Sequence, residues 1–98
     1  MLLGAASANA QMNELISADD YPIDALRSGH QGTVRFTLTI AKDGTVKKCR
    51  VTKSSGFSEL DRATCNIMRQ RARFKPALDS NGNPVEDTYS SVLSWALR

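Results

Sequence analysis

Two cysteines, Cys49 and Cys65, carry the most distinctive chemistry of this 98-residue sequence. Their spacing is not the C-x-x-C pattern, which argues against a redox dithiol or a zinc site. Cys49 lies in a strand-like segment and Cys65 in a helix-like segment, so a helix that packs across a sheet can bring them together. The even cysteine count and the small core favour a structural disulfide. Two independent buried thiols that pack as small hydrophobic side chains are the alternative.

Acidic and histidine side chains form no catalytic pattern in this sequence. His30 lies in a polar loop, where we expect it to be solvated. Nothing resembles a nucleophile elbow, a phosphate loop or a metal-spaced set of His and Cys. We therefore expect no enzyme, no catalytic residues, no metal and no cofactor. A turn, a helix start or an exposed surface explains each of four carboxylates, which are Asp43, Asp61, Asp79 and Asp87.

Size and charge limit the class of protein. A chain of 98 residues forms one domain with a small core. Its apolar and charged fractions are ordinary for a globular protein, and a net charge of +3 gives little support for nucleic-acid binding. No stretch approaches the roughly 20 apolar residues that cross a bilayer, so the sequence predicts no transmembrane anchor of its own.

The N-terminus has the features of a secretory signal. A short apolar patch, Leu2 to Ala6, precedes Ala8-Asn9-Ala10, which has the A-x-A form that signal peptidase accepts. We interpret residues 1–10 as the remnant of a signal peptide whose front is missing, with an unstructured tail as the alternative. Residues 11–20 are then an N-terminal arm, residues 21–98 the domain, and the periplasm its compartment.

Alternating apolar residues predict a β-hairpin in the middle of the chain. Val34, Phe36, Leu38 and Ile40 fall on every second residue, which is the period of a half-buried strand. Asp43-Gly44 follows as a hairpin turn signal. In the next run Val46 lies on one parity, and Cys49 and Val51 lie on the other. This change of face predicts a β-bulge.

Two helices and one more strand complete the predicted fold. Residues 22–28 form a short helix that Asp20 can cap and that Gly29 ends. Residues 59–71 form a longer helix, with Ser58 and Asp61 as its capping box. Its apolar stripe contains Leu60, Ala63, Thr64, Ile67 and Met68. A turn at 79–84 leads to a final strand at 86–97. The result is an α+β fold, a three-stranded antiparallel sheet with two helices packed on one face.

A basic cluster marks the end of the second helix. Arg69, Arg71 and Arg73 lie in or just beyond its last turn, where positive charge is favourable against the helix dipole. A patch that binds anions or lipid headgroups is the alternative interpretation.

Taken together, these pieces resemble the C-terminal domain of TonB-type energy transducers from about Asp20 onward. The resemblance implies a periplasmic αββαβ domain that acts in energy-dependent transport across the outer membrane. It also implies that a segment of an outer-membrane TonB-dependent receptor adds as a strand beside the last strand. The matching pieces include Tyr21-Pro22, Gly32-Thr33-Val34, Asp43-Gly44-Thr45-Val46, Ser54-Ser55-Gly56, Arg73-Phe74-Lys75-Pro76-Ala77 and Gly82-Asn83-Pro84-Val85.

The resemblance and the period-two pattern together define the expected partner-binding residues. They are Tyr89, Ser91, Leu93, Trp95 and Leu97 of the last strand. The family's transmembrane anchor and Pro-rich spacer do not occur in this sequence, so we expect a stand-alone periplasmic member, with a fragment of a longer chain as the alternative. The cysteine pair looks like a subgroup addition to the family pattern.

Two other functions compete with strand addition. A homodimer can form through the last strand, because an exposed strand edge can pair with its own copy. Alternatively, a cell-envelope protein without energy transduction can contact peptidoglycan or lipid headgroups through its basic side chains. Those side chains are Lys47, Lys48, Arg50 and Lys53, together with the arginines at the helix end.

Overall fold

The computed structural model describes residues 16–97 of the chain. The proposed signal remnant at 1–10 and half of the proposed arm lie outside the described residues. The elements are η1 (Ala18–Asp20), α2 (Ile23–Ser28), β1 (Gly32–Ile40), β2 (Val46–Lys53), α3 (Ser58–Arg71), β3 (Ala77–Leu78), β4 (Pro84–Val85) and β5 (Asp87–Trp95).

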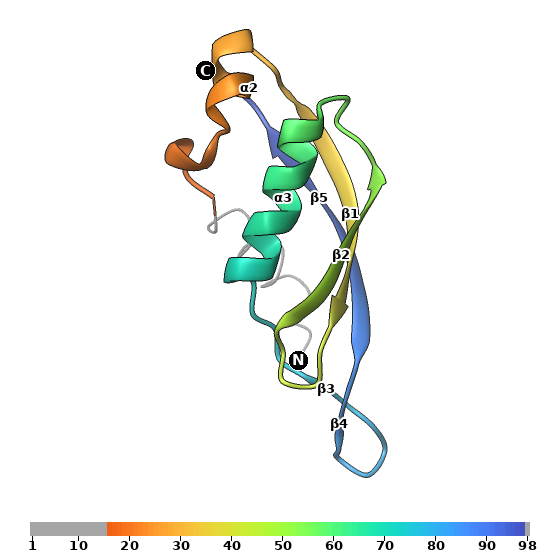
Figure 1. The fold of residues 1–98 in the computed structure, drawn as a ribbon. Coiled ribbons are helices and arrows are strands. Elements are labelled where there is room, and N and C mark those ends of the chain that lie inside the picture. Colours follow the sequence, from red (N-terminus) through yellow and green to blue (C-terminus); the bar gives the residue numbers. More distant parts are fainter. Residues whose placement is uncertain (1–15, 98) are drawn as a thin grey trace.

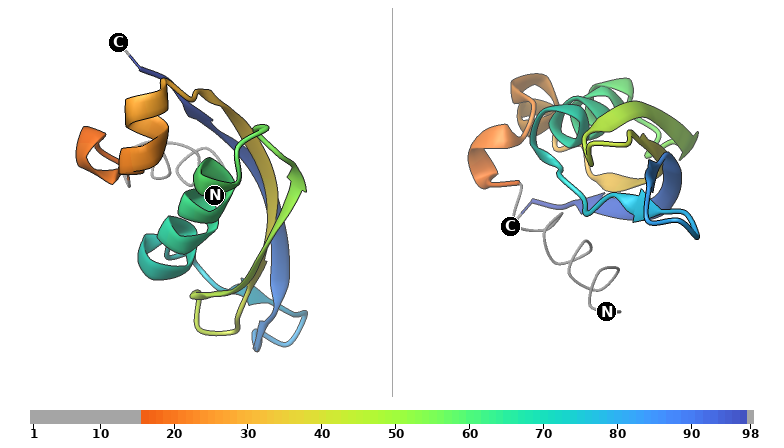
Figure 2. Two further views of the ribbon diagram at one scale, coloured as in Figure 1. Left: turned by 45° about the horizontal axis from the view of Figure 1, so that its top comes forward. Right: turned by 90° about the horizontal axis from the view of Figure 1, so that it is seen from below.

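Three antiparallel strands form the main sheet in the order β2-β1-β5, and α3 lies across one face of it (Figure 1). The short helix α2 lies at one end of the same face (Figure 2). The first strand is therefore central and the last strand lies at an edge. This arrangement confirms the predicted α+β fold.

The core forms where β1 meets α3. Val34, Phe36 and Leu38 of β1 are almost completely buried, whereas Arg35 between them is exposed. From α3, the predicted stripe supplies Leu60, Thr64, Ile67 and Met68, which are all buried. Burying one large apolar side chain contributes about 1.5–3 kcal/mol, so this contact is the main source of stability.

The predicted β-bulge is present in β2. Thr39 pairs with Lys48, but the next residue of β1, Ile40, pairs with Val46. Lys47 is therefore an extra residue, and it returns Val46 to the side of the sheet that α3 covers. In a regular strand without the bulge, the side chain of Val46 would point to the opposite face.

The predicted helix caps are wrong in detail. Helix α3 begins at Ser58, and its N-cap residue is Phe57 rather than Ser58. The Asp61 carboxylate accepts hydrogen bonds from the backbone N–H of Ser55 at 3.0 Å and from the Ser55 hydroxyl at 2.8 Å. Asp61 thus fixes the loop before the helix, because that loop turns back over the first turn of α3.

The short helix and the histidine also differ from expectation. Helix α2 ends as predicted at Gly29, which has a left-handed φ of 69°. Asp20 does not cap this helix, whose N-cap residue is Pro22. His30, which we expected to be solvated, stacks on Phe57 at 3.9 Å and places Nδ1 2.7 Å from a carboxylate oxygen of Glu59.

The last strand, Asp87–Trp95, is shorter than predicted, because its partner β1 begins at Gly32, opposite Trp95. The register runs from Gly32 with Trp95 to Ile40 with Asp87, so within residues 16–97 no strand lies beside the residues that follow Trp95. Before β5, the predicted turn at 79–84 closes a small second ladder of β3 and β4. The Asp79 carboxylate shapes this turn by accepting the backbone N–H groups of Asn81 and Asn83.

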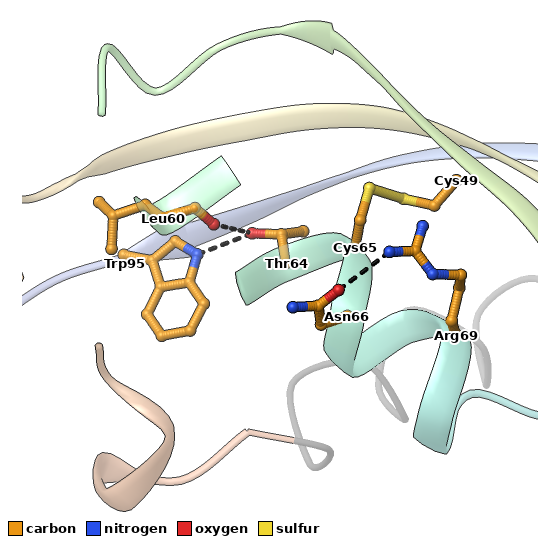
Figure 3. Close-up of a disulfide and its surroundings, with 7 residues drawn as sticks. All are labelled: Cys49, Leu60, Thr64, Cys65, Asn66, Arg69 and Trp95. Carbon is orange, nitrogen blue, oxygen red and sulfur yellow. Dashed lines mark hydrogen bonds between the residues drawn. A yellow bond between two sulfur atoms is a disulfide. The ribbon is translucent and has the colours of Figure 1, made fainter. Parts of the chain in front are cut away.

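A disulfide between Cys49 and Cys65 joins β2 to α3, which confirms the predicted pairing (Figure 3). The two Cα atoms lie 5.5 Å apart, and the bond closes a loop with a sequence separation of 16. The edge strand β2 is thereby fixed to the helix that covers the sheet.

Removing this disulfide is expected to lower the free energy of unfolding by about 3 kcal/mol, because the unfolded chain regains the freedom of the closed loop. Urea unfolding of the Cys49→Ala/Cys65→Ala variant measures the loss. The oxidised wild-type protein should lose a similar amount on reduction, and the variant should not respond to reductant. A wild-type midpoint that does not change on reduction would contradict a stabilising bond.

Gly44 allows close approach of the segment that follows α3. It has a φ of 89°, and a Cβ at this position would lie 2.1 Å from the carbonyl oxygen of Phe74. The Phe74 N–H donates to the Gly44 carbonyl at 2.8 Å, so the two backbones are in direct contact. Gly82 has a similar φ of 81°, but nothing lies within 4 Å of its Cβ position.

These two glycines separate backbone strain from steric clash. Gly82→Ala should cost about 1 kcal/mol of unfolding free energy, because alanine is strained at positive φ. Gly44→Ala should cost about 2 kcal/mol more, because the Phe74 backbone must also move. Chemical denaturation of both variants measures the difference, and equal losses would show that the close contact is unimportant.

Candidate partner-binding edge

The outer edge of β5 is the best candidate for a binding site. Within residues 16–97, no other strand pairs with this side of β5. On its inner side β5 pairs with β1 over nine successive positions without a register shift. The outer edge is therefore a regular row of backbone N–H and C=O groups nine residues long, which is the structure that an added strand needs.

Side chains on β5 divide between the two faces of the sheet. Four of the five residues expected to bind a partner lie on β5 itself, on the face that α3 covers. Leu93 and Trp95 are buried there, and Tyr89 and Ser91 are half-buried. Leu97 lies beyond the end of the strand, where its backbone N–H donates to the Gln31 side chain at 2.7 Å. Contact with a partner at this edge would therefore involve mainly the strand's backbone.

Trp95 fixes the end of the strand to the rest of the fold. Its indole N–H donates to the Thr64 hydroxyl at 2.9 Å, and this hydroxyl donates to the Leu60 carbonyl at 2.8 Å (Figure 3). Tyr21 packs edge-on against the indole, with ring centroids 5.3 Å apart. The Tyr21 hydroxyl in turn donates to the His30 carbonyl. The Thr64 and Tyr21 contacts were not predicted from the sequence, because they join segments that are distant along the chain.

The opposite edge of the sheet has a very different character. Strand β2 carries a positive charge at four of its eight positions, Lys47, Lys48, Arg50 and Lys53. Its pairing with β1 is interrupted by two register shifts. Lysine side chains and bulges are devices that protect a strand edge from pairing with another chain. By contrast, Asp87 is the only charged residue of β5, and it lies at the start of the strand.

The uncovered face of the sheet is polar near β5. Thr88, Ser90 and Ser94 are exposed there, and Val92 is 46% exposed. Hydroxyl pairs join this strand to β1: Thr37 lies 2.8 Å from Ser90, and Thr33 lies 3.0 Å from Ser94. These pairs hold the two strands in register on the uncovered face.

The three arginines of the predicted basic patch have separate partners. Arg69 donates to the Asn66 side chain at 2.9 Å, and Arg73 donates to the Ala72 carbonyl at 2.7 Å. Arg71 forms a two-pronged ion pair with Asp20, with both N–O distances at 2.8 Å. This pair ties η1 to the end of α3.

The carboxylates serve the fold as turn and loop residues. Hydrogen bonds from the hydroxyl and backbone N–H of Thr45 lower the pKa of the Asp43 carboxyl. Asp61 and Asp79 accept loop hydrogen bonds, as described above. Among residues 16–97, no three His, Cys, Asp or Glu side chains converge on a possible metal site. Across the same residues, no helix is long and apolar enough to cross a membrane.

Asp20 gives the fold an acid-sensitive contact. Hydrogen bonds from the Arg71 guanidinium hold the pKa of this carboxyl well below its usual range. A carboxyl with a lowered pKa stabilises the folded state above its unfolded pKa of about 3.9, and this contribution disappears as the pH falls through the folded pKa.

Asp20→Asn is therefore expected to lower the urea midpoint at pH 6, and the gap to wild type should narrow as the pH falls below about 4. Asp19→Asn, the same charge change on the neighbouring exposed residue, is the control and should have a smaller effect. A gap that stays constant down to pH 2 would contradict a stabilising role of the ionised carboxyl.

Comparison with known proteins agrees with this geometry. A family profile described as "Gram-negative bacterial TonB protein C-terminal" matches residues 17–97. The TonB2 protein of Pseudomonas aeruginosa is 36% identical over 75 residues, which is 76% of this chain and 27% of that protein. The chain thus spans about a quarter of the length of this relative.

Solved structures show the same fold. The solution structure of the Helicobacter pylori TonB C-terminal domain has a TM-score of 0.71 and 23% identity, covering 94% of this chain and 82% of that one. The Pseudomonas aeruginosa TonB C-terminal domain has a TM-score of 0.65 and 27% identity, covering 79% and 76%. The family is non-enzymatic, in agreement with the sequence analysis. The chain belongs to the TonB C-terminal domain family.

Proposed function

We propose that this domain acts in the periplasm as the receptor-contacting part of a TonB-type energy transduction system. In this proposal an extended segment of a TonB-dependent receptor in the outer membrane adds as a strand to the outer edge of β5. The added strand gains affinity from backbone hydrogen bonds, and the alternate side chains of the segment determine selection.

The difference between the two sheet edges is the observation that carries this proposal. The β2 edge is bulged, cationic and tied to α3 by the disulfide, whereas the β5 edge is regular and almost uncharged. At about 3.3 Å per residue, the nine residues of β5 offer an edge of about 30 Å. A receptor segment of similar length can lie along this edge.

The way in which β5 would resist a pulling force also supports β5 as the binding edge. A force applied along the added strand would shear β5 against β1, so that the hydrogen bonds of nine residue pairs resist together. Trp95 and Leu93 hold β5 to the core from the face that α3 covers. In this proposal their burial contributes to binding by keeping the edge straight, and no direct contact with the partner is needed.

The cationic β2 strand favours one competing function. Lys48 and Arg50 are exposed and pair with Thr39 and Thr37 of β1, so they lie on the uncovered face of the sheet. Anionic envelope material such as lipid headgroups would bind there through charge. Such binding fades as salt screens the charges, whereas a backbone-mediated complex persists.

Proline substitution tests the edge directly. Successive residues of a strand point their N–H groups to opposite sides, so one of Ser90 and Ser91 faces β1 and the other faces outward. Proline at the outward position should leave the sheet intact and block the added strand, and proline at the other position should destabilise the sheet. The folded variant is used as bait in a pull-down from an outer-membrane extract. We expect it to retain no β-barrel receptor, as measured by mass spectrometry of the bound proteins.

Charge reversal on β2 provides the matched control. Lys48→Glu/Arg50→Glu should retain receptor recovery at both low and high salt, and circular dichroism should show which proline variant is folded. Receptor recovery that survives in the folded proline variant would contradict strand addition to β5. Recovery that vanishes at high salt or on charge reversal would instead support binding through the cationic face.

A further inference from the structure

A groove opens at the end of β5, beside the first described helices η1 and α2. Its volume is about 530 Å³. Tyr21 and Leu26 line one wall, and Trp95, Ala96 and Leu97 line the other. Among the described residues that line it, none is charged, and Leu26 is 47% exposed although it is a large apolar side chain.

The walls of the groove are held in place by contacts on both sides. The Asp20–Arg71 ion pair fixes η1, and the edge-on contact between Tyr21 and Trp95 sets the distance between the walls. The indole cannot turn easily, because its N–H is bound to Thr64. The groove is thus a preformed feature of the fold, so its side chains would lose little conformational entropy when a ligand binds.

The position of the groove relates it to the β5 edge. Ser94 and Trp95 belong both to the last residues of β5 and to the groove wall, and the wall continues through Ala96 and Leu97. A strand that adds to β5 and runs past Trp95 would leave the sheet and pass over this apolar opening. The first side chain beyond the end of the sheet would then lie against it.

We propose that the groove accepts one large apolar side chain of the peptide segment that adds to β5, and so selects among segments. This inference rests on the proposed function. Backbone pairing alone tolerates almost any sequence, because every residue except proline offers the same N–H and C=O groups. An uncharged groove at a fixed distance along the strand adds a requirement for an aliphatic or aromatic residue at one position, and it disfavours a charged residue there.

The chain offers an internal probe and a matched control. Trp95 is the only tryptophan of the sequence and lines the groove, so its fluorescence reports occupancy directly. Ile23 is 56% exposed on the same short helix as Leu26, but it does not line the groove. Leu26→Asp and Ile23→Asp therefore introduce the same charge at similarly exposed positions, inside and outside the groove.

The experiment selects binders from a display library of random nine-residue peptides on the wild-type domain. We expect enriched peptides that prefer a large apolar residue at one position near one end. Replacing that residue by alanine should weaken binding about tenfold or more and reduce the change in Trp95 fluorescence. The preference should disappear in Leu26→Asp and persist in Ile23→Asp.

The outcomes distinguish the two proposals. Enriched peptides whose binding is blocked by the folded proline variant of β5, but which show no positional apolar preference, would overturn the groove alone. Enrichment of no peptide would count against strand addition and against the groove that depends on it. If sedimentation shows a dimer that Leu26→Asp separates and Ile23→Asp does not, a second copy occupies the groove and the peptide proposal is wrong.

Discussion

The contact between the apolar stripe of α3 and the alternating side chains of β1 is the constraint on which the rest of the structure depends. Phe36 and Leu38 share one buried cluster with Leu60 and Met68, and the strand that carries them is the central one of the sheet. The remaining strands then occupy the two edges. The disulfide places β2 firmly on one side, and Trp95 with its hydrogen bond to Thr64 places the end of β5 on the other.

The two edges have opposite physical properties, and the proposed function follows from this difference. An edge that carries positive charge at half of its positions, and that is bulged, resists pairing with other chains. An edge made of serine, threonine and apolar residues does not. In a sheet of three strands both edges would otherwise be equally available, so in the proposed function the charge and the bulges of β2 leave β5 as the edge for an incoming strand.

The segment before the sheet has a role that its short elements do not suggest. Neither η1 nor α2 is long enough to be stable alone. They are positioned by the ion pair between Asp20 and Arg71, by the edge-on contact of Tyr21 with Trp95 and by the burial of Ala25. Through these contacts a weakly helical segment becomes a wall beside the end of β5. In the proposed function this wall is the feature that distinguishes one peptide from another.

Local pattern determined much of this protein, because periodicity and turn chemistry act between near neighbours in the chain. The alternation in β1, the Asp43-Gly44 turn, the parity change at Val46 and the stripe of α3 were all predicted from the sequence, as was the last strand to within two residues at its C-terminal end. The predicted partner-binding residues lie on this strand or just beyond it, and the tertiary structure buried Leu93 and Trp95 under the helix. It also decided the cap of α3, the stacking of His30 on Phe57 and the groove between Leu26 and Trp95. These features depend on contacts between segments far apart in sequence, whose distances no local pattern encodes.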